Sequence, residues 1–171
     1  MLQYQTGQAI VWRDAVTNWF LHESGIADSA GRVGHYIGRV EAESMQLDGY
    51  ETVAVTPWEA ASGGQAIECK RAYCTAAFRY DGQPGWRTLR IEYFDQNNGA
   101  AKYRVFVNDQ PIDQWTAADH LPTQKLDGTS STRRTVSGIA LRPGDRIRIE
   151  GMPDAQETAA LDYVEVTSEP N

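Results

Sequence analysis

From Arg39 to the end of the chain, apolar and polar residues alternate with a period of two. Leu89, Ile91 and Tyr93, for example, alternate with polar residues, as expected of a strand that buries one face. Turn-forming residues separate the alternating runs. The expected strands cover residues 39–47, 50–56, 65–69, 73–80, 87–94, 101–108, 111–115, 133–141, 145–151 and 160–167. Short strands with one apolar face predict an antiparallel β-sandwich.

The connections between these strands carry recognisable turn chemistry. Pro143-Gly144 suits the two central positions of a type II turn, and Asn108-Asp109 marks another turn. The polar stretch 116–132 has little periodicity and predicts a long surface loop.

The first part of the chain has a helical period instead. Over residues 7–24, one stripe gathers Ala9, Trp12, Val16, Trp19 and Phe20. This apolar stripe predicts a helix that docks on the β-domain or on a partner domain. Glycines make residues 25–38 a linker. We therefore expect residues 1–37 to hold a helix and linker, as a possible remnant of a preceding catalytic domain, and residues 38–171 to form the sandwich.

The stretch Arg39–Gly49 combines strand periodicity with acidic residues. Alternation places Glu41 and Glu43 on the face of two large apolar side chains. A buried carboxylate needs a cation, and an all-oxygen ligand set favours Ca²⁺. Asp162 lies on an apolar strand face near the other end of the chain, so the first and last strands would meet and hold the metal. Solvent-facing acids on an edge strand are the alternative interpretation.

Composition excludes some classes of function. The chain has 171 residues, 41% hydrophobic content and a net charge of −7. This charge argues against nucleic-acid binding, which normally uses a basic face. No apolar run approaches the roughly 20 residues of a membrane helix. The N-terminus lacks the pattern of a signal peptide, which means little if the chain is part of a longer protein.

The two cysteines, Cys69 and Cys74, lie close in sequence. Either a local disulfide or two buried thiols fits this spacing. A disulfide would favour an extracellular or periplasmic protein, whereas reduced thiols would fit a cytoplasmic one. The three histidines are scattered and form no metal or catalytic spacing.

Six short motifs together resemble a carbohydrate-binding module of the family 35 and family 6 type. They are E-A-E at 41–43, S-G-G at 62–64, F-R-Y at 78–80, Y-F-D-Q-N-N at 93–98, L-R-P-G-D at 141–145 and L-D-Y-V-E-V at 161–166. The resemblance covers residues 38–167. It implies a jelly-roll β-sandwich with a structural calcium held by Glu41, Glu43 and Asp162, and by backbone carbonyls near 60–64.

The predicted helix carries a second resemblance. Residues 12–15, W-R-D-A, followed by Trp19-Phe20, resemble a helix late in bacterial α-glucuronidases of glycoside hydrolase family 67. This likeness implies that the chain is the C-terminal module of such an enzyme. It also implies an intracellular, cytoplasmic enzyme if the cysteines are reduced, with the catalytic carboxylates upstream of this sequence.

In modules of these families the sugar usually binds among loops at one rim of the sandwich. The matching loops here are 56–64, 95–99, 128–134 and 152–160, and a site could also have moved towards 116–132. An aromatic face for the pyranose ring and planar polar groups for its hydroxyls are the expected ligands. The candidates are Trp58, Glu59, Asp95, Asn97, Asn98, Trp115 and Arg133. Core packing for Trp58, turn geometry for the asparagines and a solvated strand start for Arg133 remain alternatives.

Two departures from the family pattern weaken the usual site. The third loop reads T-S-S-T-R-R without a tryptophan, and Ala160 replaces the usual asparagine before the closing strand. The leading hypothesis is a non-catalytic module that binds plant cell-wall polysaccharide, xylan or glucuronoxylan, for an attached catalytic domain. The alternative is a structural or dimerisation domain of an α-glucuronidase that binds no sugar. Neither nucleic acid nor a membrane is an expected partner, and no nucleophile motif indicates catalysis.

Overall fold

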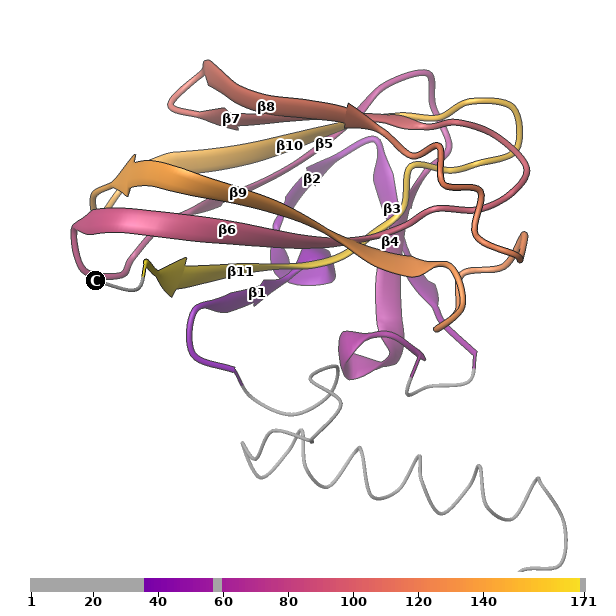
Figure 1. Cartoon of the computed structure of the whole chain (residues 1–171), viewed down its shortest axis with the longest axis horizontal. Coiled ribbons are helices and arrows are strands. Elements are labelled where there is room, and N and C mark those ends of the chain that lie inside the picture. Colours follow the sequence, from indigo (N-terminus) through magenta and orange to yellow (C-terminus); the bar gives the residue numbers. More distant parts are fainter. Residues whose placement is uncertain (1–35, 57–59, 170–171) are drawn as a thin grey trace, which may run out of the picture.

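The computed structural model describes residues 36–56 and 60–169, which form two antiparallel β-sheets packed face to face (Figure 1). The predicted N-terminal helix lies outside the described residues. The six-stranded sheet has the order β3 (Tyr50–Ala54), β4 (Gln65–Cys69), β11 (Leu161–Ser168), β6 (Gly85–Phe94) and β9 (Ser131–Leu141), with β1 (Arg39–Glu41) also paired to β11. The five-stranded sheet has the order β2 (Gln46–Asp48), β5 (Cys74–Arg79), β10 (Arg146–Met152), β7 (Lys102–Val107) and β8 (Gln110–Thr116). The predicted β-sandwich is therefore confirmed.

The period-two pattern decides which side chains enter the core. In β10, Ile147 and Ile149 are fully buried, whereas Arg146 and Arg148, which alternate with them, are half-buried on the outer face. The main apolar core includes Tyr103, whose ring stacks on Trp115 with centroids 4.9 Å apart. A second, smaller cluster joins Ala60 and Ala61 to Phe94 and Ala160, beneath the loops at one end of the sandwich.

One predicted strand is wrong. Residues 39–47 do not form a continuous strand, because a 3₁₀ turn, η1 (Ala42–Ser44), separates β1 from β2. The two short strands belong to different sheets, so the chain crosses the sandwich at this turn, and Ala42 and Met45 are buried there. Strand alternation therefore does not place Glu41 and Glu43 on one face. The predicted meeting of the first and last strands is confirmed, since Glu41 lies opposite Tyr163 in the β1–β11 pair.

Two hairpin turns have the backbone that their residues predicted. Gly144 has a φ of 94°, and the Asp145 N–H donates to the Arg142 carbonyl at 3.0 Å, as in a type II turn. Asn108 and Asp109 both have positive φ, which matches the twist of a two-residue β-hairpin.

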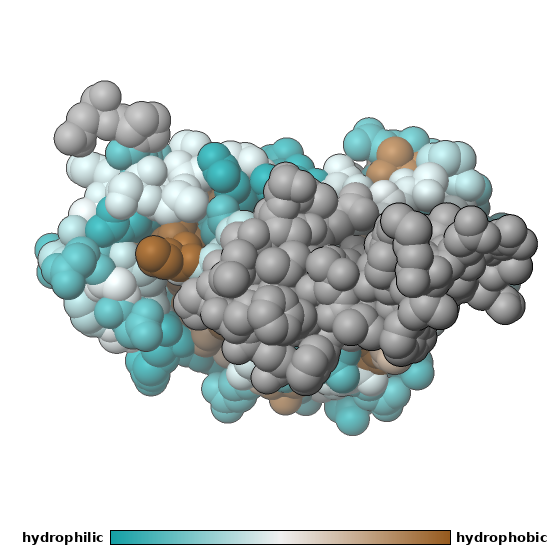
Figure 2. Space-filling view, turned by 90° about the horizontal axis from the view of Figure 1, so that it is seen from below, coloured by the Kyte–Doolittle hydropathy of each residue, from teal (hydrophilic) through white to brown (hydrophobic). Residues whose placement is uncertain are grey.

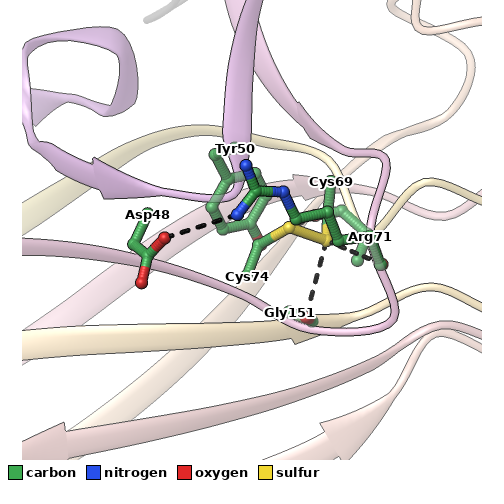
Figure 3. Close-up of a disulfide and its surroundings, with 7 residues drawn as sticks. Asp48, Tyr50, Cys69, Arg71, Cys74 and Gly151 are labelled. Carbon is green, nitrogen blue, oxygen red and sulfur yellow. Dashed lines mark hydrogen bonds and ion pairs between the residues drawn. A yellow bond between two sulfur atoms is a disulfide. The ribbon is translucent and has the colours of Figure 1, made fainter.

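Cys69 and Cys74 form a disulfide, which resolves the choice between bonded and reduced cysteines (Figure 3). Cys69 ends β4 in one sheet and Cys74 begins β5 in the other, so the bond joins the two sheets at the turn between them. Both residues are buried, and Gly151 approaches the Cys69 sulfur through its carbonyl at 3.8 Å.

On the face shown in Figure 2, the described residues that are visible are mainly hydrophilic, with a few isolated hydrophobic residues among them. Of the large apolar side chains in the described part of the chain, Ile37, Tyr73 and Trp86 are exposed. Within 36–56 and 60–169, no helix has the length and hydrophobicity needed to cross a membrane.

Candidate functional site

The three predicted metal ligands come together where β1 meets β11. Asp162, on β11, is 1% exposed and accepts hydrogen bonds from the Ser62 backbone N–H at 3.0 and 3.1 Å. The Ser62 hydroxyl donates to Glu41 Oε1 at 2.7 Å. Ser62 begins η3 (Ser62–Gly64), the loop predicted to supply backbone ligands, and Glu43 lies in η1 beside Glu41. Three stretches distant in sequence, 41–43, η3 and β11, therefore build one acidic cluster, which we call the β1–β11 acidic cluster: Glu41, Glu43 and Asp162.

These carboxylates repel one another in a poorly hydrated place. Burial raises the pKa of Asp162 well above its ordinary value, and the negative charges of Glu41, Glu92 and Glu43 raise it further. Burial also raises the pKa of Glu43 to about 7, and the charge of Glu41 adds to this rise. The Oε2 atom of Glu43 is buried without a hydrogen bond among the described residues.

The neighbouring cation, Arg39, serves other groups. Its guanidinium pairs with Glu165 at 3.0 Å and lies 3.7 Å from the centre of the Tyr163 ring. One of its nitrogens also reaches Ser62 Oγ at 3.4 Å. The acidic cluster therefore shares this one positive charge with a carboxylate that binds it more directly.

The chemistry of the cluster fits a hard divalent cation. All of its side-chain donors are carboxylate oxygens, one of them buried without a partner, and the η3 loop brings backbone oxygens to the same end of β11. As the side chains are placed, however, no group of three His, Cys, Asp or Glu residues within 36–56 and 60–169 could hold a metal ion.

A second group of buried acids ties the loops at one end of the sandwich. Asp95, just after β6, is fully buried and accepts hydrogen bonds from the backbone N–H groups of Asp119 and His120, both at 3.0 Å. Glu157 is also fully buried and accepts from the N–H groups of Gln96 at 3.3 Å and Ala101 at 3.4 Å. These two acids are loop anchors, since they satisfy backbone donors of neighbouring loops.

Further backbone contacts complete this loop rim, which we define as residues 95–101, 117–130 and 153–160. The Asn97 N–H donates to the Thr123 carbonyl at 3.0 Å, and the Gln156 N–H donates to the Asn98 carbonyl at 3.2 Å. The Asn97 side chain is exposed, and Asn98 is half-buried with its Oδ1 atom unpaired among the described residues. The structure thus joins three of the predicted loops and leaves Asn97 open to solvent.

Trp115 lies next to the loop rim, at the open edge between the two sheets. Its ring stacks on Tyr103 and contacts Tyr93, with centroids 5.5 Å apart. Burial raises the pKa of Tyr93 to about 12, and the nearby charges of Asp95 and Asp119 contribute, which places this aromatic cluster beside the loop anchors. Trp115 is half-buried, so it serves the core and leaves part of its ring accessible.

Arg134, the neighbour of the predicted sugar ligand Arg133, faces Trp115 from the other sheet. Its guanidinium lies 5.6 Å from the Trp115 ring and donates two hydrogen bonds to Asp113, at 2.7 and 2.9 Å. This bidentate pair bridges β8 and β9, the edge strands of opposite sheets. The alternation of side chains along β9 could have separated the roles of the two arginines, because it places Arg133 and Arg134 on opposite faces of the sheet.

Arg133 lies away from the loop rim, on the outer face of the six-stranded sheet. It donates to Glu92 Oε2 at 3.0 Å and to the Tyr163 hydroxyl at 2.7 Å, and Ser131 also donates to Glu92. This network compensates a carboxylate that is 7% exposed. Trp58 and Glu59 lie outside the described residues. The predicted sugar ligands thus do not gather around one point, although Asp95, Asn97, Asn98 and Trp115 share one end of the sandwich.

Comparison with known proteins gives two consistent likenesses at the level of sequence. The chain is 43% identical over 170 residues to "Probable alpha-glucuronidase A" of Aspergillus terreus, a match that covers 95% of this chain and 20% of that protein. It is 44% identical over 172 residues to the protein of the same name from Aspergillus fumigatus, covering 96% and 20%. The chain is therefore homologous to a C-terminal segment of these fungal proteins and spans about a fifth of their length. No protein-family model matches the chain.

Solved structures show the fold. A family 35 carbohydrate binding module from Clostridium thermocellum superposes with a TM-score of 0.58 at 12% identity, covering 77% of this chain and 98% of that one. An exo-β-1,3-galactanase from Phanerochaete chrysosporium gives a TM-score of 0.56 at 19% identity, covering 81% and 31%. The described sandwich thus has the fold of carbohydrate-binding modules. The relatives found are fungal, and the likeness to bacterial family 67 enzymes stays a prediction.

Proposed function

We propose that this chain is a non-catalytic carbohydrate-binding module of a glycoside hydrolase and that it binds plant cell-wall xylan, in particular glucuronoxylan. The observation that carries the proposal is the homology to a segment of α-glucuronidase in a chain with the fold of carbohydrate-binding modules. A binding module raises the concentration of substrate near an attached catalytic domain, because the second encounter becomes intramolecular.

The loop rim and the adjoining Trp115 edge are the proposed sugar site. The loop anchors hold three loops in fixed positions, which lowers the entropy lost when a ligand is bound. Trp115 offers part of an aromatic face, and Asn97 offers an exposed planar amide for hydroxyl groups. Arg134, with a side chain 41% exposed, is placed to meet the carboxylate of a glucuronic acid substituent. Trp58 and Glu59 stay predicted ligands from the neighbouring loop.

Calcium bound by the β1–β11 acidic cluster is part of this proposal. Glu41, Glu43 and Asp162 would hold the ion, with backbone oxygens of the η3 loop. Its positive charge would offset the repulsion that raises the pKa of Glu43 and Asp162. The ion would fasten β1 and η3 to β11 and would have a structural role.

The direct test is affinity electrophoresis on glucuronoxylan, unsubstituted xylan and pectin, each with calcium and with chelator. We expect retardation by glucuronoxylan, and weaker retardation after Trp115→Ala or Arg134→Gln. Arg142→Gln, on an exposed turn far from the rim, is the matched control for the arginine variant. Absence of retardation on every polymer, from a protein whose melting temperature still rises with calcium, would contradict sugar binding.

A structural or dimerisation domain is the second candidate. Trp115 is stacked within the aromatic core and Asp95 is fully used by backbone donors, so two predicted sugar ligands have structural roles. Sedimentation of the full-length parent protein with and without this segment distinguishes the candidates. Loss of a dimer without any change in polysaccharide retention would favour the structural role.

The disulfide also favours one location. Disulfides persist in oxidising compartments, so we propose that the protein is exported rather than cytoplasmic. Thiol alkylation of the protein from its native source, followed by mass spectrometry, tests this proposal. Alkylation of Cys69 and Cys74 without prior reduction would contradict it.

A further inference from the structure

The outer face of the five-stranded sheet is basic, although the whole chain is acidic. This sheet is the upper layer of Figure 1, and alternation along β5, β7 and β10 brings five cationic side chains to its outer face. We call it the basic face: Arg79, Lys102, Arg104, Arg146 and Arg148. The chain as a whole has a net charge of −7, so this concentration of positive charge contrasts with the rest of the molecule.

Acidic residues neutralise only part of the basic face. Glu150, 4% exposed, pairs with Arg104 at 2.8 Å and also contacts Arg148. Arg148 reaches the exposed Asp109 at 3.4 Å. Five cations therefore meet Glu150 on β10 and Asp109 in the turn between β7 and β8, while the exposed Asp48 at the β2 edge of the same face pairs with Arg71 at 3.7 Å. The side chains of Lys102 and Arg146 have no ion pair or hydrogen bond within residues 36–56 and 60–169.

The two unpaired cations each border a hollow in the same face. A hollow of about 490 Å³ lies over β7 and β8, where Lys102 and Arg104 share the lining with Trp115 of the proposed sugar site. A second hollow of about 280 Å³ lies over β2, β5 and β10, beside Arg79 and Arg146. Neighbouring strands lie about 4.8 Å apart, so the distance from β2 at one hollow to β8 at the other is about 19 Å.

The side chains between the hollows suit an extended ligand. Arg148 lies 4.2 Å from the centre of the Phe106 ring, and Arg104 lies 5.9 Å from it, so the ring holds both guanidinium groups over the middle of the face. Gln46 lines the smaller hollow and Gln114 lines the larger one. The face thus presents well-separated cations with hydroxyl-binding amides among them.

We infer that the basic face is a second binding surface, for an acidic polysaccharide whose carboxylates are spaced along the chain. Charge complementarity selects an anionic ligand, and the amides suit the hydroxyls of sugar rings. A nucleic acid carries one charge per about 1.7 Å, and the acidic remainder of this protein would repel so dense a polyanion. This inference rests on the proposed polysaccharide binding, and the basic face adjoins the proposed sugar site at Trp115, which also lines the first hollow.

The test uses glucuronoxylan and the same polymer with its uronic acids chemically reduced to neutral sugars. The variant is Lys102→Gln with Arg146→Gln, which removes both unpaired cations. The control is Lys70→Gln with Arg142→Gln, which changes the net charge equally at exposed positions outside the basic face. Titration calorimetry at low salt is the measurement, with circular dichroism to check that each variant is folded.

We expect the unmodified protein to bind native glucuronoxylan about fivefold more tightly than the reduced polymer, as two exposed charge contacts would give. This preference should weaken with salt, disappear in the Lys102/Arg146 variant and persist in the control. An unchanged preference in the Lys102/Arg146 variant would overturn the inference while leaving sugar binding at the rim intact.

Other outcomes identify other occupants. Binding to both polymers without preference overturns the inference alone, and binding to neither overturns it together with the proposed function. Tight binding of duplex DNA that the variant abolishes would assign the face to a dense polyanion instead. Self-association that the same variant abolishes, without any polymer preference, would assign it to a second copy of the chain.

Discussion

The loop rim and the β1–β11 acidic cluster both bury carboxylates, but they compensate the negative charge differently. Asp95 and Glu157 each accept two backbone N–H groups from neighbouring loops. Among the described residues, Asp162 accepts hydrogen bonds from the Ser62 N–H alone and has other carboxylates as its further neighbours. Backbone donors therefore stabilise the ionised rim acids and oppose the effect of burial, whereas the acidic cluster has fewer such donors and a greater need for a proton or a cation. This difference separates loop anchors from a candidate ion site.

The largest effect should come from removing a loop anchor. Asp95→Ala leaves two N–H groups, those of Asp119 and His120, without their acceptor. We expect a loss of about 3 kcal/mol in the free energy of unfolding, because an unsatisfied buried donor costs about 1–3 kcal/mol. Urea denaturation is the measurement. Asp95→Asn, which keeps one acceptor oxygen, should lose less, and equal losses would show that the carboxylate does not act through these bonds.

The acidic cluster should respond to calcium in a way that the rim acids do not. A calcium concentration of 100 times Kd would stabilise the folded chain by about 2.7 kcal/mol if the unfolded chain does not bind the ion. Thermal unfolding with calcium and with chelator measures this increase. Glu43→Gln should reduce it, while Glu157→Gln should leave it unchanged. A calcium effect that depends on Glu157 and not on Glu43 would reverse the assignment of the two regions.

Glu92 provides an intermediate case, in which a side-chain cation compensates a buried carboxylate. Arg133 donates to Glu92 at 3.0 Å, and its side chain is 42% exposed, so solvent weakens the pair. We expect Arg133→Gln to lower the free energy of unfolding by about 1 kcal/mol in urea, less than Asp95→Ala does. A loss larger than that of Asp95→Ala would mean that the side-chain cation compensates better than backbone donors.

The sequence predicted the fold well because the period of two is a local signal. The expected strand 65–69 matches β4 (Gln65–Cys69), and the others from residue 50 onwards differ by a few residues at their ends. The same signal failed at residues 42–44, where the chain crosses between sheets and a 3₁₀ turn replaces the strand. The acidic cluster was nevertheless found, because the resemblance carried its residues independently of strand parity.

The candidate sugar site was harder to predict, because long-range contacts decide the role of each polar residue. Nothing local indicates that Asp95 faces the N–H groups of Asp119 and His120, 24 and 25 residues further along the chain. The pairing of Arg134 with Asp113 likewise depends on which edge strands of the two sheets are neighbours. Residue type suggested polar ligands, but only the packing of the loops separates anchors from open groups such as Asn97.

The smallest effect should be the pH dependence that Glu157 introduces at the loop rim. Burial is the main cause of its raised pKa, and the charge of Asp95 adds to it, while the N–H bonds from Gln96 and Ala101 oppose it. Because the folded pKa lies above the ordinary value of 4.5, the folded state binds the proton more tightly than the unfolded state. The stabilisation is therefore complete below pH 4.5 and is lost as the pH rises through the folded pKa. Urea denaturation at several pH values, in chelator and on a Glu43→Gln background, should show this decline, and Glu157→Gln should flatten it. If the decline persists unchanged in Glu157→Gln, another group causes it, and the backbone donors compensate Glu157 fully.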